Sequence, residues 1–170
     1  GADGAAGEGD LDGDRRAAAR LITTVENGGP RAEAVLEALY PRLRGVHRLG
    51  ITGPPGVGKS TLVDSLIRRH RALDHRVGVV AVDPTSPFTG GAVLGDRVRM
   101  NDLAADRGVF IRSMATRGSL GGLARSSKEV LDVLEAFGLD VLLLETVGVG
   151  QTEMDVASTA DTTVVVLSPE

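Results

Sequence analysis

The chain has 170 residues, which is enough for one α/β domain with a sizeable core and too few for two ordinary domains. Its residues are 42% hydrophobic and 25% charged, with 23 glycines and 7 prolines, a composition that excludes a collagen, a coiled coil and a fully disordered chain. The absence of cysteine excludes disulfide scaffolds and thiolate metal sites.

The formal net charge of −4 is concentrated at the N-terminus. Residues 1–14 contain five acids and no base, so taking these five negative charges from −4 leaves the rest of the chain at +1. Without a basic face or many aromatic side chains, we expect no nucleic-acid partner. No apolar run approaches the roughly 20 residues that a membrane helix requires, and no secretory signal pattern is present. We therefore expect a cytoplasmic protein without membrane contact.

The N-terminal part of the chain divides into a tail and a helical segment. Residues 1–14 are Gly, Ala and acids, which predict a disordered acidic tail. Residues 15–45 form the expected helical segment, because apolar residues recur at helical spacing over 15–26 and over 31–39.

From residue 46 to residue 170, short apolar runs alternate with helical stretches, which predicts a single domain. The expected strands are 46–52, 77–82, 109–112, 140–144 and 162–167. The expected helices are 59–73, 97–106 and 122–137. Strands separated by helices form parallel sheets covered on both faces, and such sheets bind ligands at the carboxyl ends of their strands. We therefore predict an α/β fold with a mostly parallel sheet and helices on both faces.

A phosphate-binding pattern follows the first predicted strand directly. Residues 53–60, GPPGVGKS, satisfy G-x-x-x-x-G-K-[ST] between a strand and a helix, which is the context that a P-loop requires. Backbone N–H groups of such a loop and the positive end of the helix hold phosphates. We expect Lys59 to contact the β- and γ-phosphates and Ser60 to bind Mg²⁺. A chance match is disfavoured because Lys59 and Lys128 are the only lysines.

Acidic residues stand near the ends of later strands. Asp83 ends the second strand. We expect its carboxylate either to contact Mg²⁺ or to begin an ordinary Asx turn. Asp96 ends a glycine-rich loop, as a switch residue or as the cap of the next helix. Glu145 ends the fourth strand and precedes Gly148, so we expect this pair to sense the γ-phosphate, the acid through Mg²⁺ and the glycine N–H directly.

Weaker candidates lie between these motifs. Gln151 is either a residue that orients the attacking water or a solvated loop residue, and Arg117 is a candidate for stabilising phosphoryl charge. The histidines, His47, His70 and His75, show no metal-ligand spacing.

Four sequence blocks occur in a specific order: GITGPPGVGKSTL, VVAVDPTSPFTGGAVLGDRVRM, TRGSLGG and LLLETVGVGQTE. Together they resemble the MeaB/ArgK-type GTPases that chaperone B12-dependent acyl-CoA mutases, a family related to the human methylmalonic aciduria type A protein. The resemblance extends from about Arg15 to Leu167. It implies a P-loop NTPase fold, Mg²⁺ and GTP or GDP as ligands, and a nucleotide cycle that gates adenosylcobalamin delivery to methylmalonyl-CoA mutase or a relative and protects that enzyme.

The resemblance also implies roles for individual residues. The family's acids around Mg²⁺ and the γ-phosphate match Asp83, Asp96 and Glu145. We therefore expect these three acids and Lys59 to be catalytic. The same three acids and Ser60 are the expected metal ligands. A homodimer is a further expectation. The residues expected to contact the nucleotide are Gly53, Pro54, Pro55, Gly56, Val57, Gly58, Lys59, Ser60, Thr61 and Gly148.

One feature of the family pattern is missing. Family members are longer and read guanine with an Asn-Lys-x-Asp loop, to which neither lysine of this chain belongs. We therefore expect a domain truncated at its C-terminus, with no sequence signal for GTP over ATP. Alternatives are a P-loop small-molecule kinase in which Asp83 or Asp96 acts on a substrate hydroxyl, a nucleotide-binding module without turnover, and a nickel-insertion GTPase. The absence of cysteine disfavours the last.

Overall fold

The structure is a computed structural model that describes residues 11–83, 103, 105–115, 122–146, 154 and 157–170. The elements, in chain order, are α1 (Leu11–Asn27), α2 (Pro30–Leu39), a 3₁₀ turn η1 (Tyr40–Arg42), β1 (Arg48–Thr52), α3 (Lys59–Ala72), β2 (Val77–Asp83), β3 (Val109–Ala115), α5 (Gly122–Ala136), β4 (Val141–Thr146) and β5 (Thr162–Val165). None of these described helices combines the length and the apolarity needed to cross a bilayer.

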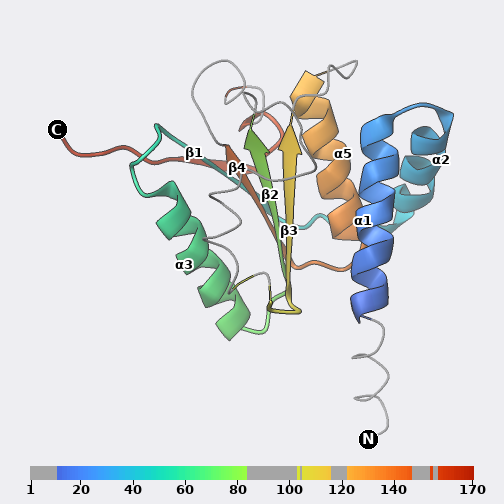
Figure 1. Cartoon of the computed structure of the whole chain (residues 1–170), viewed down its shortest axis with the longest axis horizontal. Coiled ribbons are helices and arrows are strands. Elements are labelled where there is room, and N and C mark those ends of the chain that lie inside the picture. The colour runs from blue at the N-terminus through green and yellow to red at the C-terminus, as the bar shows by residue number, and fades with distance from the viewer. Residues whose placement is uncertain (1–10, 84–102, 104, 116–121, 147–153, 155–156) are drawn as a thin grey trace, which may run out of the picture.

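The five strands form one sheet in the order β3-β2-β4-β1-β5, and every neighbouring pair is parallel. Helix α3 covers one face of the sheet, while α5, α1 and α2 lie on the other (Figure 1). The predicted α/β fold with helices on both faces of a parallel sheet is therefore confirmed. Since all five strands run the same way, their carboxyl ends meet at one edge.

Among the described residues, the core consists of two apolar clusters, one on each face of the sheet. On β2, Val77 and Val79 pack with Val63 and Ile67 of α3, while the alternate residues of the strand contact the α5 side. This alternation follows from the two-residue period of a strand. Because both faces are covered there, the central strands β2 and β4 are nearly continuous apolar runs instead of alternating polar and apolar sequences.

The start of the first helix differs from the sequence prediction. Helix α1 begins at Leu11, so residues 11–14, which we expected in the tail, are helical. A tertiary contact accounts for this, because the Arg15 guanidinium donates to the carbonyl of Val109 and fixes the start of α1 against β3. The expected helix over 97–106 falls largely outside the described residues, although Leu103 is helical and buried in the cluster beside α3.

A buried carboxylate on α5 ties the N-terminal helices to the sheet. Glu135 is 3% exposed, and its Oε2 accepts hydrogen bonds from the backbone N–H groups of Arg44 (2.8 Å) and Gly45 (3.4 Å). Its Oε1 accepts from the N–H of Val46 at 2.9 Å. The N–H groups of Arg44, Gly45 and Val46 thus bond to this side chain instead of to a neighbouring strand, and β1 begins after them, at Arg48.

The far end of α3 carries two histidines in contact. The Nδ1 atoms of His70 and His75 lie 3.0 Å apart, and the N–H of His75 donates to the His70 carbonyl at 2.9 Å. Burial, and then the charge of His75, lower the pKa of His70. Next to this pair, Arg71 donates to Asp106 at 3.0 Å, and this hydrogen bond lowers the pKa of Asp106.

We predict that Glu135→Ala lowers the free energy of unfolding by about 3 kcal/mol or more, since hydrogen bonds to a charged group contribute about 1.5–3 kcal/mol each. Urea unfolding followed by circular dichroism measures this loss. Glu129→Ala on the same helix is the control, because its Arg125 partner has a side chain 63% exposed and such pairs contribute only about 0.3–0.5 kcal/mol. Equal losses in the two variants would contradict the role given to Glu135.

We also predict that stability falls as the pH is lowered through 6.5, the ordinary pKa of histidine. The folded-state pKa of His70 lies below that value, so the unfolded chain binds more protons in this range. Thermal unfolding midpoints between about pH 8 and pH 5.5 are expected to decline less in His70→Gln than in the parent. Asp106, whose ordinary pKa is 3.8, titrates below this window. Identical slopes in variant and parent would rule out the contribution of His70.

Candidate functional site

The phosphate loop connects the end of β1 to the start of α3 at the carboxyl edge of the sheet. Gly53 has a φ of 141°, and a Cβ at this position would lie 2.2 Å from the carbonyl oxygen of Val166. Gly58 has a φ of 98° and precedes α3 with no side-chain cap. Two glycines of the motif are therefore required by the backbone, and the N–H groups of the first turn of α3 face the loop without intrahelical partners.

Lys59 is held between the phosphate loop and the neighbouring strand. The residue is only 7% exposed, and its Nζ donates to the carbonyl oxygens of Gly53 at 2.5 Å and Thr146 at 3.0 Å. A buried ammonium requires such acceptors because the loss of its water shell is otherwise unfavourable. The contacts fix the ammonium at the edge where the loop turns into α3, which is where the motif requires it.

The ends of three adjacent strands meet at this edge. Strand β4 lies between β1 and β2, with Glu145 opposite Ile51 on one side and opposite Ala81 on the other. Glu145 and Thr146 are 2% and 3% exposed. The backbone of Asp83 ends β2 at the same edge. The topology thus places the phosphate loop, Glu145 and the Asp83 main chain at the same edge of the sheet.

The remaining expected site residues lie partly inside and partly outside the described part of the chain. Ser60 is half-buried and Thr61 exposed in the first turn of α3, and the loop residues Pro54, Pro55 and Gly56 are exposed. The other expected residues, Asp96 and Gly148, and the weaker candidates, Arg117 and Gln151, lie outside the described residues.

Two threonines beside Lys59 were not predicted as site residues. Thr146 supplies one of the two carbonyls that hold the ammonium, and its hydroxyl donates to the hydroxyl of Thr52 at 3.2 Å. The signal for both was their position: each is the last residue of a strand that ends at the phosphate-binding edge. The sequence does not show that their side chains meet, because 94 residues separate them.

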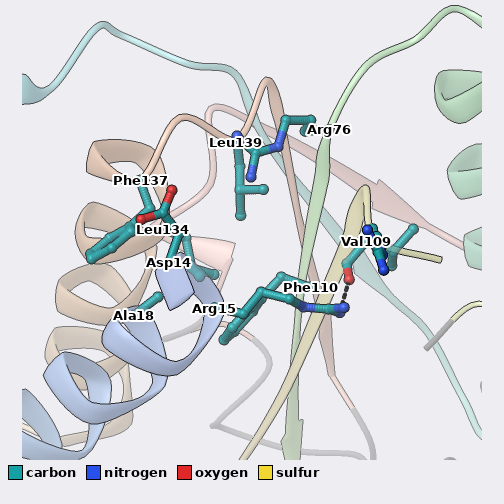
Figure 2. Close-up of a pocket in the computed structure, with 10 residues that line it drawn as sticks. Asp14, Arg15, Ala18, Arg76, Val109, Phe110, Leu134, Phe137 and Leu139 are labelled. Atoms are coloured by element: carbon teal, nitrogen blue, oxygen red, sulfur yellow. Dashed lines mark hydrogen bonds between the residues drawn. The ribbon is translucent and has the colours of Figure 1, made fainter. Parts of the chain in front are cut away.

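A cavity of about 20 Å³ lies at the opposite edge of the sheet and is not part of this site. Figure 2 shows it between α1, α5 and the start of β3, with Phe110, Leu134 and Phe137 among its apolar lining and Arg15 bonded to the Val109 carbonyl. Its volume suffices for about one water molecule. The cavity therefore belongs to the packing of α1.

Several known proteins are similar to this chain in sequence. The family model for the methylmalonyl-CoA mutase-associated GTPase MeaB matches residues 18–170. A putative GTPase of Pyrococcus horikoshii is 58% identical over 157 residues, covering 92% of this chain and 50% of its own length. GTPase ArgK of Escherichia coli is 45% identical over 153 residues, covering 88% and 46%. The mitochondrial methylmalonic aciduria type A homolog of Mus musculus is 37% identical over 171 residues, covering 92% and 41%.

The fold agrees with a solved structure as well. The crystal structure of a LAO/AO transport system kinase superposes with a TM-score of 0.69 at 32% identity, covering 94% of this chain and 50% of that one. The chain spans about half the length of the curated relatives it matches. The family match includes the phosphate loop and every strand of the sheet. With its P-loop fold, the chain therefore belongs to the MeaB family of methylmalonyl-CoA mutase-associated GTPases, as the sequence motifs predict.

Proposed function

We propose that this chain binds and hydrolyses GTP with Mg²⁺, and that the cycle assists adenosylcobalamin loading and protection of methylmalonyl-CoA mutase or a related acyl-CoA mutase. The observation that carries the proposal is the buried ammonium of Lys59, held by two backbone carbonyls at the N-terminus of α3. The relatives named as GTPases and the family's name, which associates it with the mutase, support the nucleotide and the partner.

The chain's own groups suit a triphosphate. The N–H groups in the first turn of α3 bind phosphate oxygens and add the positive end of the helix dipole. An ammonium has three N–H donors, and within the described residues Lys59 uses two of them. Its third N–H is thereby available to a phosphate oxygen, and its charge offsets the negative charge that develops during phosphoryl transfer.

The metal would be held by hydroxyl and carboxylate oxygens. Mg²⁺ prefers such hard donors, and the expected ligands are Ser60, Asp83, Asp96 and Glu145. The position of two of them at the carboxyl edge supports the proposal, since Ser60 is in the first turn of α3 and Glu145 is buried at the end of β4. When bound, the ion neutralises charge on the phosphates.

We also propose a homodimer and a cytoplasmic location. The location follows from the proposed role, because a GTPase that regulates an acyl-CoA mutase acts where the mutase and GTP occur. The preference for guanine rests on the relatives named as GTPases.

A second candidate function is a P-loop kinase. The solved structure at 32% identity is named a LAO/AO transport system kinase, which favours transfer of phosphate to an acceptor other than water. Phosphate release from GTP and Mg²⁺ alone, measured on the 170-residue chain, supports the GTPase. Formation of GDP and a phosphorylated acceptor, only when that acceptor is added, supports the kinase. Nucleotide binding without GDP formation in a single-turnover assay leaves only a binding module.

We predict that Lys59→Ala weakens GTP binding roughly ten- to hundredfold, because a charge-assisted hydrogen bond contributes about 1.5–3 kcal/mol. Isothermal titration calorimetry with GTP and Mg²⁺ measures the change. Lys128→Ala is the matched control, since the only other lysine has a side chain 53% exposed and pairs with Asp132 on α5. Unchanged affinity in Lys59→Ala would reject the phosphate site.

We predict that Glu145→Gln slows GTP hydrolysis about ten- to hundredfold and weakens its Mg²⁺ dependence, while nucleotide stays bound, because the substitution removes the charge and keeps the shape. Single-turnover rates across a Mg²⁺ titration measure this. Glu129→Gln, which alters an acid on α5 whose partner is exposed, serves as the control. Equal rates in Glu145→Gln and parent at every Mg²⁺ concentration would refute the role.

A further inference from the structure

A pair of threonine hydroxyls joins β1 to β4 next to the phosphate loop. The Oγ1 of Thr146 donates to the Oγ1 of Thr52 at 3.2 Å, and the two residues are 3% and 8% exposed. Hydrogen bonds between buried polar groups fix the geometry around them, because losing a partner leaves a desolvated group unsatisfied. The pair therefore fixes the separation of the two strand ends.

The two threonines are linked to both acceptors of the Lys59 ammonium. Thr146 supplies one acceptor with its own carbonyl oxygen, at 3.0 Å from Nζ. Thr52 is covalently followed by Gly53, whose carbonyl oxygen is the other acceptor, at 2.5 Å. The hydroxyl bridge thus joins Thr146 to the residue directly before Gly53, beside the connection that the ammonium makes between Thr146 and Gly53.

The hydroxyl pair lies one position beyond the paired residues of β1 and β4. The register between β1 and β4 extends from Arg48 opposite Leu142 to Ile51 opposite Glu145, so the threonines are the next position. On its other side, the end of β1 is fixed by the backbone, since the Thr52 carbonyl accepts from the N–H of Val166 at 2.8 Å. Towards β4, the hydroxyl bond adds a side-chain contact to the backbone pairing of the two strands.

We propose that Thr52 and Thr146 are positioning residues that place the ammonium of Lys59 for phosphate binding. With two of its N–H donors bonded to the carbonyls, the direction of the third is set by where those carbonyls lie. Small misplacement of a charged donor weakens its bond to a ligand strongly, because hydrogen bonds depend steeply on angle. The inference rests on the proposed function, since it assumes that Lys59 binds the phosphates of a nucleotide.

The first test replaces each threonine by an isosteric residue without a hydroxyl. Thr146→Val removes the donor and Thr52→Val removes the acceptor, and each is expected to weaken GTP–Mg²⁺ binding about three- to tenfold. Thr146→Ser keeps the hydroxyl and is the matched control, expected to bind like the parent. Calorimetry on the 170-residue chain gives the affinities, and circular dichroism identifies any variant that does not fold.

A double-mutant cycle separates positioning from a merely structural role. In a Lys59→Ala background there is no ammonium to place, so Thr146→Val is expected to leave the remaining affinity for a fluorescent GTP unchanged. A structural role would lower the affinity by the same factor in both backgrounds. The hydroxyl pair then serves the sheet alone, and the inference is wrong.

A second measurement needs no nucleotide. Labelling the lysines with ¹³C and ¹⁵N gives two sets of side-chain signals, from Lys59 and Lys128. Thr146→Val is expected to shift only those of Lys59, and Thr146→Ser to leave both in place. Unmoved Lys59 signals in Thr146→Val would overturn the inference even if binding in the Lys59→Ala background is too weak to measure.

The outcomes also distinguish this inference from the function on which it rests. If Lys59→Ala leaves GTP affinity unchanged, the proposed phosphate site is wrong and the threonines have nothing to position. If Lys59→Ala weakens binding but neither valine variant does, the phosphate site stands and the positioning role is rejected.

Discussion

A buried ammonium at the end of a parallel sheet is the interaction on which the rest of this structure depends. Lys59 is inside the protein, so its charge requires acceptors that cannot move away. The carbonyls of Gly53 and Thr146 meet that requirement only because β1 and β4 are neighbours and end together. A side chain at Gly53 would collide with the Val166 carbonyl, so the first glycine of the loop is needed for the same geometry.

The two edges of the sheet carry different kinds of polar groups. The carboxyl edge carries the phosphate loop, Glu145 and the end of β2, which are the groups of the proposed nucleotide site. At the amino edge and beside α5, the ionic and polar contacts act within the protein: Glu135 holds the segment before β1, and Arg71 holds Asp106. The N-terminal helices pack on α5, away from the phosphate loop (Figure 1), so they support the sheet and leave the loop accessible.

The sequence predicts the features that depend on local pattern. Residues 53–60 identify the loop because its glycines, lysine and serine are adjacent in the chain, and the apolar runs identify the strands because both faces of the sheet are buried. Contacts between distant residues were not predictable. The start of α1 depends on Arg15 reaching Val109, and the Thr52–Thr146 bridge depends on β1 lying beside β4. Neither pairing leaves a signal in a single sequence, since each joins residues more than 90 positions apart.

The most direct test of the central claim is a crystal structure of the chain with Mg²⁺ and a non-hydrolysable GTP analogue. Our account predicts the phosphates at the N-terminus of α3, with the Lys59 Nζ about 2.7–2.9 Å from a β- or γ-phosphate oxygen and still bonded to the Gly53 and Thr146 carbonyls. An analogue bound elsewhere, or phosphates seated on the loop while the Lys59 ammonium points away from them, would contradict it.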